Sequence, residues 1–344
     1  MLPRPPSAAA RETPEPCLND STFHSTITPP SAREWGVRAG PEIDALEAEF
    51  SQYVGRAHAV TVGSCYDAMH RSLVALGIGP GNEVITVANT EIACTAAIRR
   101  TGADVVFADI DERTHSVAPE DLETRITPRT RAVLVVHMYG HPADMDRIGE
   151  IAERRALLVI EDAALAVGAT LHGRSVGTFG HVGCFSHAPS KILGNAGDGG
   201  TIVTDDAELA DAARHMFLYW QMRGSRTFAH GAKLHAGFHL IEEGTRGRMV
   251  ELSAAILRVK LGHLERWIEA QRRIADAYRE RLTETDVILP VEVGDVRHAY
   301  RNFAVRVPER RDTVRATGRS RRRDRHALRA AAPSPAGLRG AGPS

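Results

Sequence analysis

The clearest candidate for chemistry in this sequence is Lys191, which lies between a Ser/Pro turn and a Gly-rich loop in the segment GCFSHAPSKILG, with GDGG shortly after it. Lysine is rare here: of 43 basic residues, only Lys191, Lys233 and Lys260 are lysines. A lysine held away from bulk water has a lowered pKa and can form a Schiff base with a carbonyl compound. Taken alone, the pattern favours an ordinary loop lysine that caps a carbonyl.

A second candidate is the pair of carboxylates Glu161 and Asp162, which end the apolar run 157–160. That run predicts a buried strand, and ligands of open α/β sheets bind beyond the carboxyl ends of the strands. A carboxylate there, 29 residues before Lys191, is the expected partner of a protonated pyridine nitrogen. The alternative is a strand-end aspartate that caps the next helix.

A third segment, VGSCYDA at 62–68, reads as a strand, a turn and the start of a helix. Backbone amides exposed at a helix start attract anions, so Ser64, Cys65 and Tyr66 form a candidate phosphate site. By itself this segment is only weak evidence for a phosphate site. It supports one only together with Lys191 and Asp162.

The elements that must position these residues alternate along the chain. Short apolar runs separated by helical spacing predict a mainly parallel sheet covered on both faces, an α/β architecture. We expect strands at 57–62, 83–87, 104–108, 132–137 and 157–160, and helices at 66–76, 92–100 and 146–154. A helical pattern then runs from 249 to 282 and predicts the connection to a smaller domain, which begins with a strand at 298–307.

The composition narrows the classes of function. The 344 residues carry 43 basic and 43 acidic side chains, so no net charge favours nucleic acid or an anionic membrane as partner. No apolar run is long enough to span a bilayer, and the first residues lack the apolar core of a signal peptide, so we expect a cytoplasmic protein. Neither the four cysteines nor the 16 histidines show the spacing of a disulfide framework or a metal site.

We divide the chain into four parts. Residues 1–30 are Pro-rich and predict a mobile arm; 31–248 form the large domain, and 249–308 the connecting helix and part of a small domain. Residues 309–344 are rich in Arg, Ala, Gly and Pro. Two interpretations fit this tail: a disordered basic segment, or out-of-frame translation of a GC-rich gene.

Along the chain, the motifs come in the order phosphate turn, strand-end Asp162 and Ser-x-x-x-x-Lys. This order resembles that of pyridoxal-phosphate enzymes with the aspartate aminotransferase fold, fold type I. In detail the chain resembles the StrS/DegT-type sugar aminotransferases from about residue 40 to 307. The stretches that match are ALGIGPGNEVI at 75–85, VHMYGHPADM at 136–145, IEDAA at 160–164 and FSHAPSK at 185–191 with GDGG at 197–200.

The resemblance implies a role for each matching residue. Lys191 would bind pyridoxal 5′-phosphate as a Schiff base and move protons, and Asp162 would keep the pyridine nitrogen protonated. Arg246 stands where relatives place an Asn that reaches the phosphate of the partner subunit, which implies a homodimer. The remaining residues expected at the phosphate are Ser64, Cys65, Tyr66 and Ser186.

The sequence departs from the family pattern at several positions. Leu165 stands where a Gln or His approaches the phenolic oxygen of the cofactor, and leucine donates no hydrogen bond. Glu91 replaces an aromatic ring that often stacks on the pyridine, and Arg246 replaces the Asn. The small-domain motifs expected after about residue 315 are missing.

The function implied is transfer of an amino group from glutamate or glutamine to a keto-sugar, nucleotide-linked, in amino-sugar or antibiotic biosynthesis. Lys191 argues against the dehydratase relatives, which carry histidine at that position. One alternative is a cyclitol aminotransferase of the scyllo-inosose type, which shares every motif quoted. The other is a truncated, non-catalytic paralogue, which the tail, Leu165 and Glu91 would support.

Overall fold

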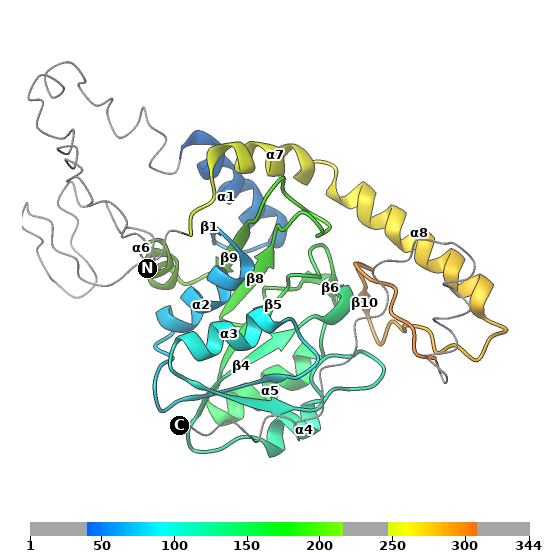
Figure 1. The fold of residues 1–344 in the computed structure, drawn as a ribbon, viewed down its shortest axis with the longest axis horizontal. Coiled ribbons are helices and arrows are strands. Elements are labelled where there is room, and N and C mark those ends of the chain that lie inside the picture. Colours follow the sequence, from blue (N-terminus) through cyan, green and yellow to red (C-terminus); the bar gives the residue numbers. More distant parts are fainter. Residues whose placement is uncertain (1–39, 216–246, 308–344) are drawn as a thin grey trace, which may run out of the picture. The chain divides into compact units, whose positions relative to one another are not determined.

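The computed structural model describes residues 40–215 and 247–307, and its central feature is a seven-stranded sheet of order β1-β9-β8-β5-β4-β2-β3 (Figure 1). All neighbouring strands are parallel except β9, which is antiparallel to both of its neighbours. The prediction of a mainly parallel α/β sheet is therefore confirmed. The strands are β1 (His58–Val62), β2 (Glu83–Val87), β3 (Asp104–Ala108), β4 (Thr130–Val136), β5 (Leu158–Asp162), β8 (Val182–Ser186) and β9 (Gly200–Thr204).

Helices follow five of the seven strands of the central sheet, as expected from the alternating pattern. Three short strands form a second sheet of order β10-β6-β7: β6 (Thr170–Leu171), β7 (Arg174–Ser175) and β10 (Val296–Arg297). The helices are α1 (Pro41–Val54), α2 (Cys65–Ala75), α3 (Ile92–Arg100), α4 (Pro119–Thr124), α5 (Met145–Arg155), α6 (Ala207–His215), α7 (Glu251–Leu261) and α8 (Leu264–Leu282), with a 3₁₀ turn at Met138–Gly140. No helix in this part of the chain is long and apolar enough to cross a membrane.

Two details of the predicted second domain are wrong. The helical pattern of 249–282 breaks at Gly262 and His263 into α7 and α8, because glycine is a poor helix former and the chain tightens to an i−3 bond there. The predicted strand at 298–307 is largely irregular: Tyr300 has a φ of 47°, and its amide donates to His298 Nδ1 at 2.9 Å. The strand that does form, β10, lies just before it.

Side chains alternate between the two faces of β8. Phe185 therefore points to one face of the sheet, and Cys184 and Ser186 point to the other. Phe185 packs edge-on against Phe50 of α1, with ring centroids 5.1 Å apart. Cys184 faces the opposite way, toward α2, where its Sγ lies 3.6 Å from Ser72 Oγ. Ser186, two residues on, shares that face. Helix α2 therefore covers the face on which the candidate site lies, and α1 covers the other.

The same alternation on β5 sends Glu161 to the α1 face, where it is fully buried and accepts three hydrogen bonds. The donors are His137 Nε2 at 2.9 Å, the Gly177 amide at 2.7 Å and the Gly180 amide at 2.6 Å. Burial alone would raise the pKa of Glu161, but these donors together hold it below the ordinary value. The Ala143 amide donates to His137 Nδ1 at 3.0 Å, which assigns the proton to Nε2.

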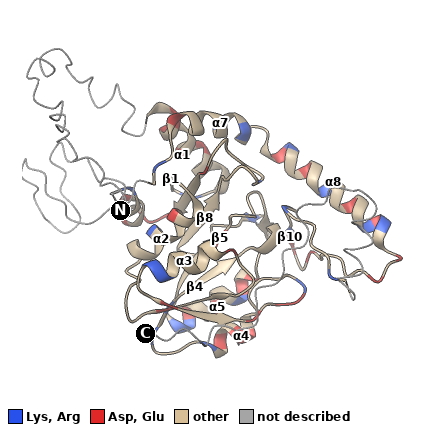
Figure 2. Cartoon of the chain, viewed as in Figure 1, with Lys and Arg blue, Asp and Glu red and all other residues tan. Residues whose placement is uncertain are grey.

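Charged residues are spread along the long helix α8 (Figure 2), and two of them form ion pairs with β10. Arg297 of β10 forms ion pairs at 2.7 Å with both Glu265 and Glu269 of α8. The boundaries proposed between the arm, the two domains and the tail stay predictions; the arm at 1–30 and the tail at 309–344 lie outside the described residues.

We expect Glu161→Gln to lower the free energy of unfolding by about 2–4 kcal/mol, because its amide nitrogen would face donors that need an acceptor. The measurement is urea unfolding at pH 7. The matched control is Glu120→Gln, which removes an exposed carboxylate paired with Arg147 and should leave the midpoint unchanged. Equal midpoints for the two variants would contradict the structural role of Glu161.

Candidate functional site

Asp162 ends the central strand β5, and its register fixes what surrounds it. It pairs with Val136 of β4 on one side and with Cys184 of β8 on the other. Its side chain is 5% exposed and faces α2 and α3. The predicted strand-end carboxylate therefore lies at the carboxyl edge of a parallel sheet, where such folds bind ligands.

The predicted phosphate turn forms the N-terminus of α2. Ser64 is the N-cap: its Oγ accepts from the Asp67 amide at 3.1 Å and lies 3.0 Å from Asp67 Oδ2, to which it donates. Among the described residues, no group accepts a hydrogen bond from the amides of Cys65 or Tyr66. These two N–H groups, at the positive end of the helix dipole, can bind a phosphate.

Cys65 differs from its expected role in one respect. Its side chain is buried and points away from the turn, with Sγ 3.9 Å from Asp162 Oδ1. Cys65 can therefore serve a phosphate only through its backbone amide, while its thiol belongs to the surroundings of the carboxylate.

Gly200 joins the phosphate turn to the end of β8. It pairs with Val62 on one side and with Ser186 on the other. A Cβ at this position would lie 2.6 Å from the carbonyl carbon and oxygen of Ser64, so only glycine allows the turn to fold over β9. Ser64 and Ser186 thereby lie at the same edge of the sheet, and their role at a phosphate stays a prediction.

Lys191 lies in the turn that follows β8, where its amide donates to Ala188 O at 2.9 Å. Among the described residues, none forms a hydrogen bond with Lys191 Nζ. Burial and then Asp162 raise the pKa of the Cys65 thiol well above its ordinary value, and the charge of Lys191 opposes this rise. By contrast, Lys260 Nζ donates to Gly194 O, and Lys233 lies outside the described residues.

His187 supports the turn that carries Lys191. It is fully buried; its Nδ1 donates to Leu193 O at 3.2 Å, and its Nε2 accepts from Thr201 Oγ1 at 2.8 Å. Burial lowers the pKa of His187 to about 4, against a smaller raising effect of the Leu193 carbonyl. The imidazole is therefore neutral at pH 7 and links the turn to β9.

Two of the positions that depart from the family pattern, Leu165 and Glu91, lie in the described part of the chain. Leu165 packs against the main apolar cluster. Glu91 is exposed at the start of α3 and makes no side-chain cap there. Arg246 lies outside the described residues, but Gly247, the next residue, accepts a hydrogen bond from the amide of Gly63 at 2.7 Å.

Sequence reasoning missed Cys94. This residue of α3 is fully buried, and its Sγ lies 2.9 Å from Asp162 Oδ2. No motif singled it out, because an isolated cysteine in an amphipathic helix resembles any small core residue. Its role depends on the distance between α3 and β5, which only the fold provides.

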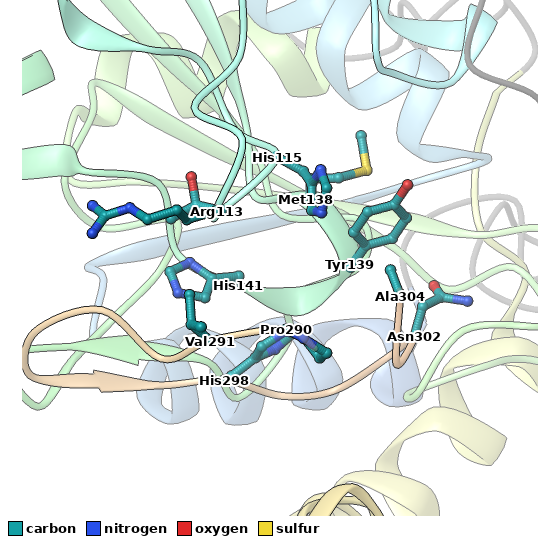
Figure 3. Close-up of a pocket in the computed structure, with 11 residues that line it drawn as sticks. Arg113, His115, Met138, Tyr139, His141, Pro290, Val291, His298, Asn302 and Ala304 are labelled. Atoms are coloured by element: carbon teal, nitrogen blue, oxygen red, sulfur yellow. The ribbon is translucent and has the colours of Figure 1, made fainter. Parts of the chain in front are cut away.

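A separate hollow lies beyond β4, beside the turn at Met138–Gly140 (Figure 3). Burial lowers the pKa of His298 to about 2 and also lowers that of His141, so both of these lining histidines are neutral at pH 7. Among the described residues that line the hollow, Arg113 is the only lysine or arginine. Its Nε lies 3.7 Å from Asp111 Oδ1, so a nearby carboxylate already balances its charge. The hollow is therefore a poorer phosphate site than the start of α2.

Comparisons with known proteins show what the whole chain is similar to. A profile of the DegT/DnrJ/EryC1/StrS aminotransferase family matches residues 20–324. The dTDP-3-amino-3,4,6-trideoxy-alpha-D-glucose transaminase of Streptomyces venezuelae is 43% identical over 279 residues, which cover 80% of this chain and 70% of that protein.

Solved structures show the same relationship. The structure of S. venezuelae DesV in complex with a ketimine intermediate is 42% identical, with a TM-score of 0.73, and the match covers 82% of this chain and 72% of that one. The structure of ntda from Bacillus subtilis with bound cofactor PMP is 30% identical, with a TM-score of 0.69, over 81% of this chain and 61% of that one.

The low pKa of His187 predicts how stability depends on pH. The unfolded chain binds a proton at this residue near pH 6.5, whereas the folded protein binds it only near pH 4, so the contribution of His187 is lost as the pH falls through that window. His187→Asn should therefore remove up to on the order of 3 kcal/mol of this dependence, measured by urea unfolding from pH 7 to 4.

The control for this experiment is the exposed His172. Its hydrogen bond to Asp146 raises its pKa, so its contribution is present below pH 6.5 and is lost as the pH rises. His172→Asn should change the pH dependence in the opposite sense. A His187→Asn profile parallel to that of the wild type would contradict the assignment of a buried neutral imidazole.

Proposed function

This chain belongs to the DegT/DnrJ/EryC1/StrS aminotransferase family, and we propose that it transfers an amino group to a keto-sugar, with pyridoxal phosphate as its cofactor. One observation carries the proposal. The carboxylate of Asp162 and the free amides at the start of α2 lie at one edge of the sheet, and Lys191 lies in the turn that follows the neighbouring strand β8.

The residues present fit the cofactor. The amides of Cys65 and Tyr66, with the hydroxyl of Ser186 beside them across Gly200, would hold the phosphate. The hydroxyl of Ser64 is engaged by Asp67, so we expect it to act mainly by ordering these amides. When bound, pyridoxal phosphate supplies an electron sink for the carbon that gains or loses the amine.

Two residues would carry the chemistry. Asp162, buried and aimed at the α2 face, would hold the proton on the pyridine nitrogen, which keeps the ring able to accept electrons. Lys191 would anchor the cofactor covalently and carry a proton between the substrate carbon and the C4′ atom. Leu165 would leave the phenolic oxygen without the hydrogen bond that a Gln or His gives, and its side chain would exclude water there instead.

For the substrates, we propose glutamate or glutamine as amino donor and a nucleotide-linked keto-sugar as acceptor. The support is the S. venezuelae relative, whose name describes a transaminase of a dTDP-linked sugar. The product would be an amino sugar, formed in amino-sugar or antibiotic biosynthesis.

The test starts from apoprotein titrated with pyridoxal phosphate. Borohydride reduction followed by peptide mapping should place the phosphopyridoxyl group on Lys191, and Lys191→Ala should lose both the label and the activity. Asp162→Asn should still take up the cofactor but turn over at least about a hundredfold more slowly, since a neutral amide cannot hold the ring proton.

Activity is measured by mass spectrometry of the aminated product, with dTDP- and UDP-keto-sugars and scyllo-inosose offered in parallel. Amination of scyllo-inosose alone would replace the sugar with a cyclitol as acceptor. Label on Lys233 or Lys260, or no cofactor uptake by the wild-type protein, would contradict the proposal.

We further propose a homodimer in which Arg246 of one subunit reaches the phosphate bound by the other. Helix α7 presents an apolar face suited to such an interface: Leu252 and Val259, seven residues apart, are 71% and 69% exposed. The competing arrangement follows from Gly247, which contacts Gly63 of its own chain and would keep Arg246 at its own phosphate.

Mixed dimers separate these arrangements. Subunits with Lys191→Ala and subunits with Arg246→Ala are each expected to be impaired. If Arg246 serves the partner, co-refolding them should restore up to about half of the wild-type activity in each hybrid, because one of its two sites then has both residues. No recovery in hybrids shown to form by sedimentation would place Arg246 at the site of its own subunit.

A further inference from the structure

The surroundings of Asp162 differ from those of any other buried carboxylate in this part of the chain. Its Oδ1 accepts from the Ala164 amide at 2.9 Å and lies 3.9 Å from Cys65 Sγ. Its Oδ2 lies 2.9 Å from Cys94 Sγ. Apart from one amide, the donors offered by the described residues are therefore thiols, which are weak donors.

Cys94 is itself held in place. Thr90 Oγ1 donates to Cys94 Sγ at 3.0 Å, which leaves the thiol hydrogen to point at Asp162. Burial, and then the charge of Asp162, raise the pKa of Cys94 well above its ordinary value. The sulfur therefore stays protonated and acts as a donor. The two hydrogen bonds therefore run in one direction: Thr90 donates to Cys94, and Cys94 donates to Asp162.

We propose that Cys94 is a positioning residue for Asp162: its thiol, oriented by Thr90, fixes the rotation of the carboxylate so that free lone pairs of Asp162 face the ring nitrogen of the cofactor. The inference rests on the proposed function, because it assumes that Asp162 meets that nitrogen. A carboxylate has about four lone-pair directions, and the contacts above leave part of them unused.

The chemistry explains why a thiol suits this position. Strong donors stabilise a carboxylate as an anion and lower its affinity for a proton, as the three donors to Glu161 do. Three strong donors of this kind on Asp162 would occupy most of its lone-pair directions. A weak donor such as Cys94 can fix the rotation of the carboxylate while leaving its other lone pairs to the ring nitrogen.

The experiment is a double-mutant cycle read by the dissociation constant of pyridoxal phosphate for the apoprotein, which is independent of turnover. Cys94→Ala should raise this constant about fivefold when Asp162 is present, and by less than about twofold in the Asp162→Asn background. Cys94→Ser, which keeps a donor at the same position, should return the constant to within about twofold of the wild type.

The matched control is Cys184→Ala, which also deletes a buried thiol of the α2 face, but one whose Sγ lies 3.6 Å from Ser72 Oγ and, among the described residues, forms no hydrogen bond with Asp162. It should lower the thermal stability of the apoprotein about as much as Cys94→Ala and leave cofactor affinity unchanged. This comparison separates loss of packing from loss of positioning.

Three outcomes would overturn the inference while the wild type binds cofactor: unchanged affinity in Cys94→Ala, an equal loss in both Asp162 backgrounds, or a Cys94→Ser variant as weak as Cys94→Ala. Failure of the proposed function looks different, because the wild-type apoprotein would then bind no pyridoxal phosphate.

Discussion

Strand β5 ends in two adjacent buried carboxylates, Glu161 and Asp162, and the elements packed around this strand must compensate both charges. Glu161 and Asp162 point to opposite faces of the sheet, and each must be compensated on its own side. Glu161 is compensated fully, by His137 and two glycine amides, and serves the fold. Asp162 receives one amide and two thiols. The difference in donors gives one carboxylate a structural role and leaves the other available for a ligand.

The remaining site residues follow from the same sheet. The carboxyl ends of β1, β5 and β8 lie at one edge, and the start of the antiparallel β9 joins them there. Gly200 lets the α2 turn approach this edge, and the buried neutral His187 fixes the turn that carries Lys191. The positions of the α2 turn and of the Lys191 turn therefore depend on Gly200 and His187, and we expect both of these residues to be sensitive to substitution.

Much of this arrangement could be predicted from the sequence. Apolar runs gave β2, β3 and α3 with their observed bounds, and the strand-end position of Asp162 followed from the length of one run. Local patterns could not reveal Cys94 at Oδ2 or the inward turn of Cys65, because both depend on how closely α2 and α3 approach β5. The predicted strand at 298–307 failed for a related reason: the amides of Ala299 and Asn302 donate to the turn at Met138–Gly140, a contact between distant segments.

The position of β9 also determines when in folding this site can exist. β9 lies between β1 and β8, and its register pairs His58 with Thr204, more than a hundred residues apart in the chain. Closing so long a loop is entropically unfavourable until the intervening parallel strands have assembled. The turn at Ser64 meets Gly200 only after that closure. A ligand bound at this turn would therefore stabilise the completed sheet and not a partly folded chain in which β9 is still unpaired.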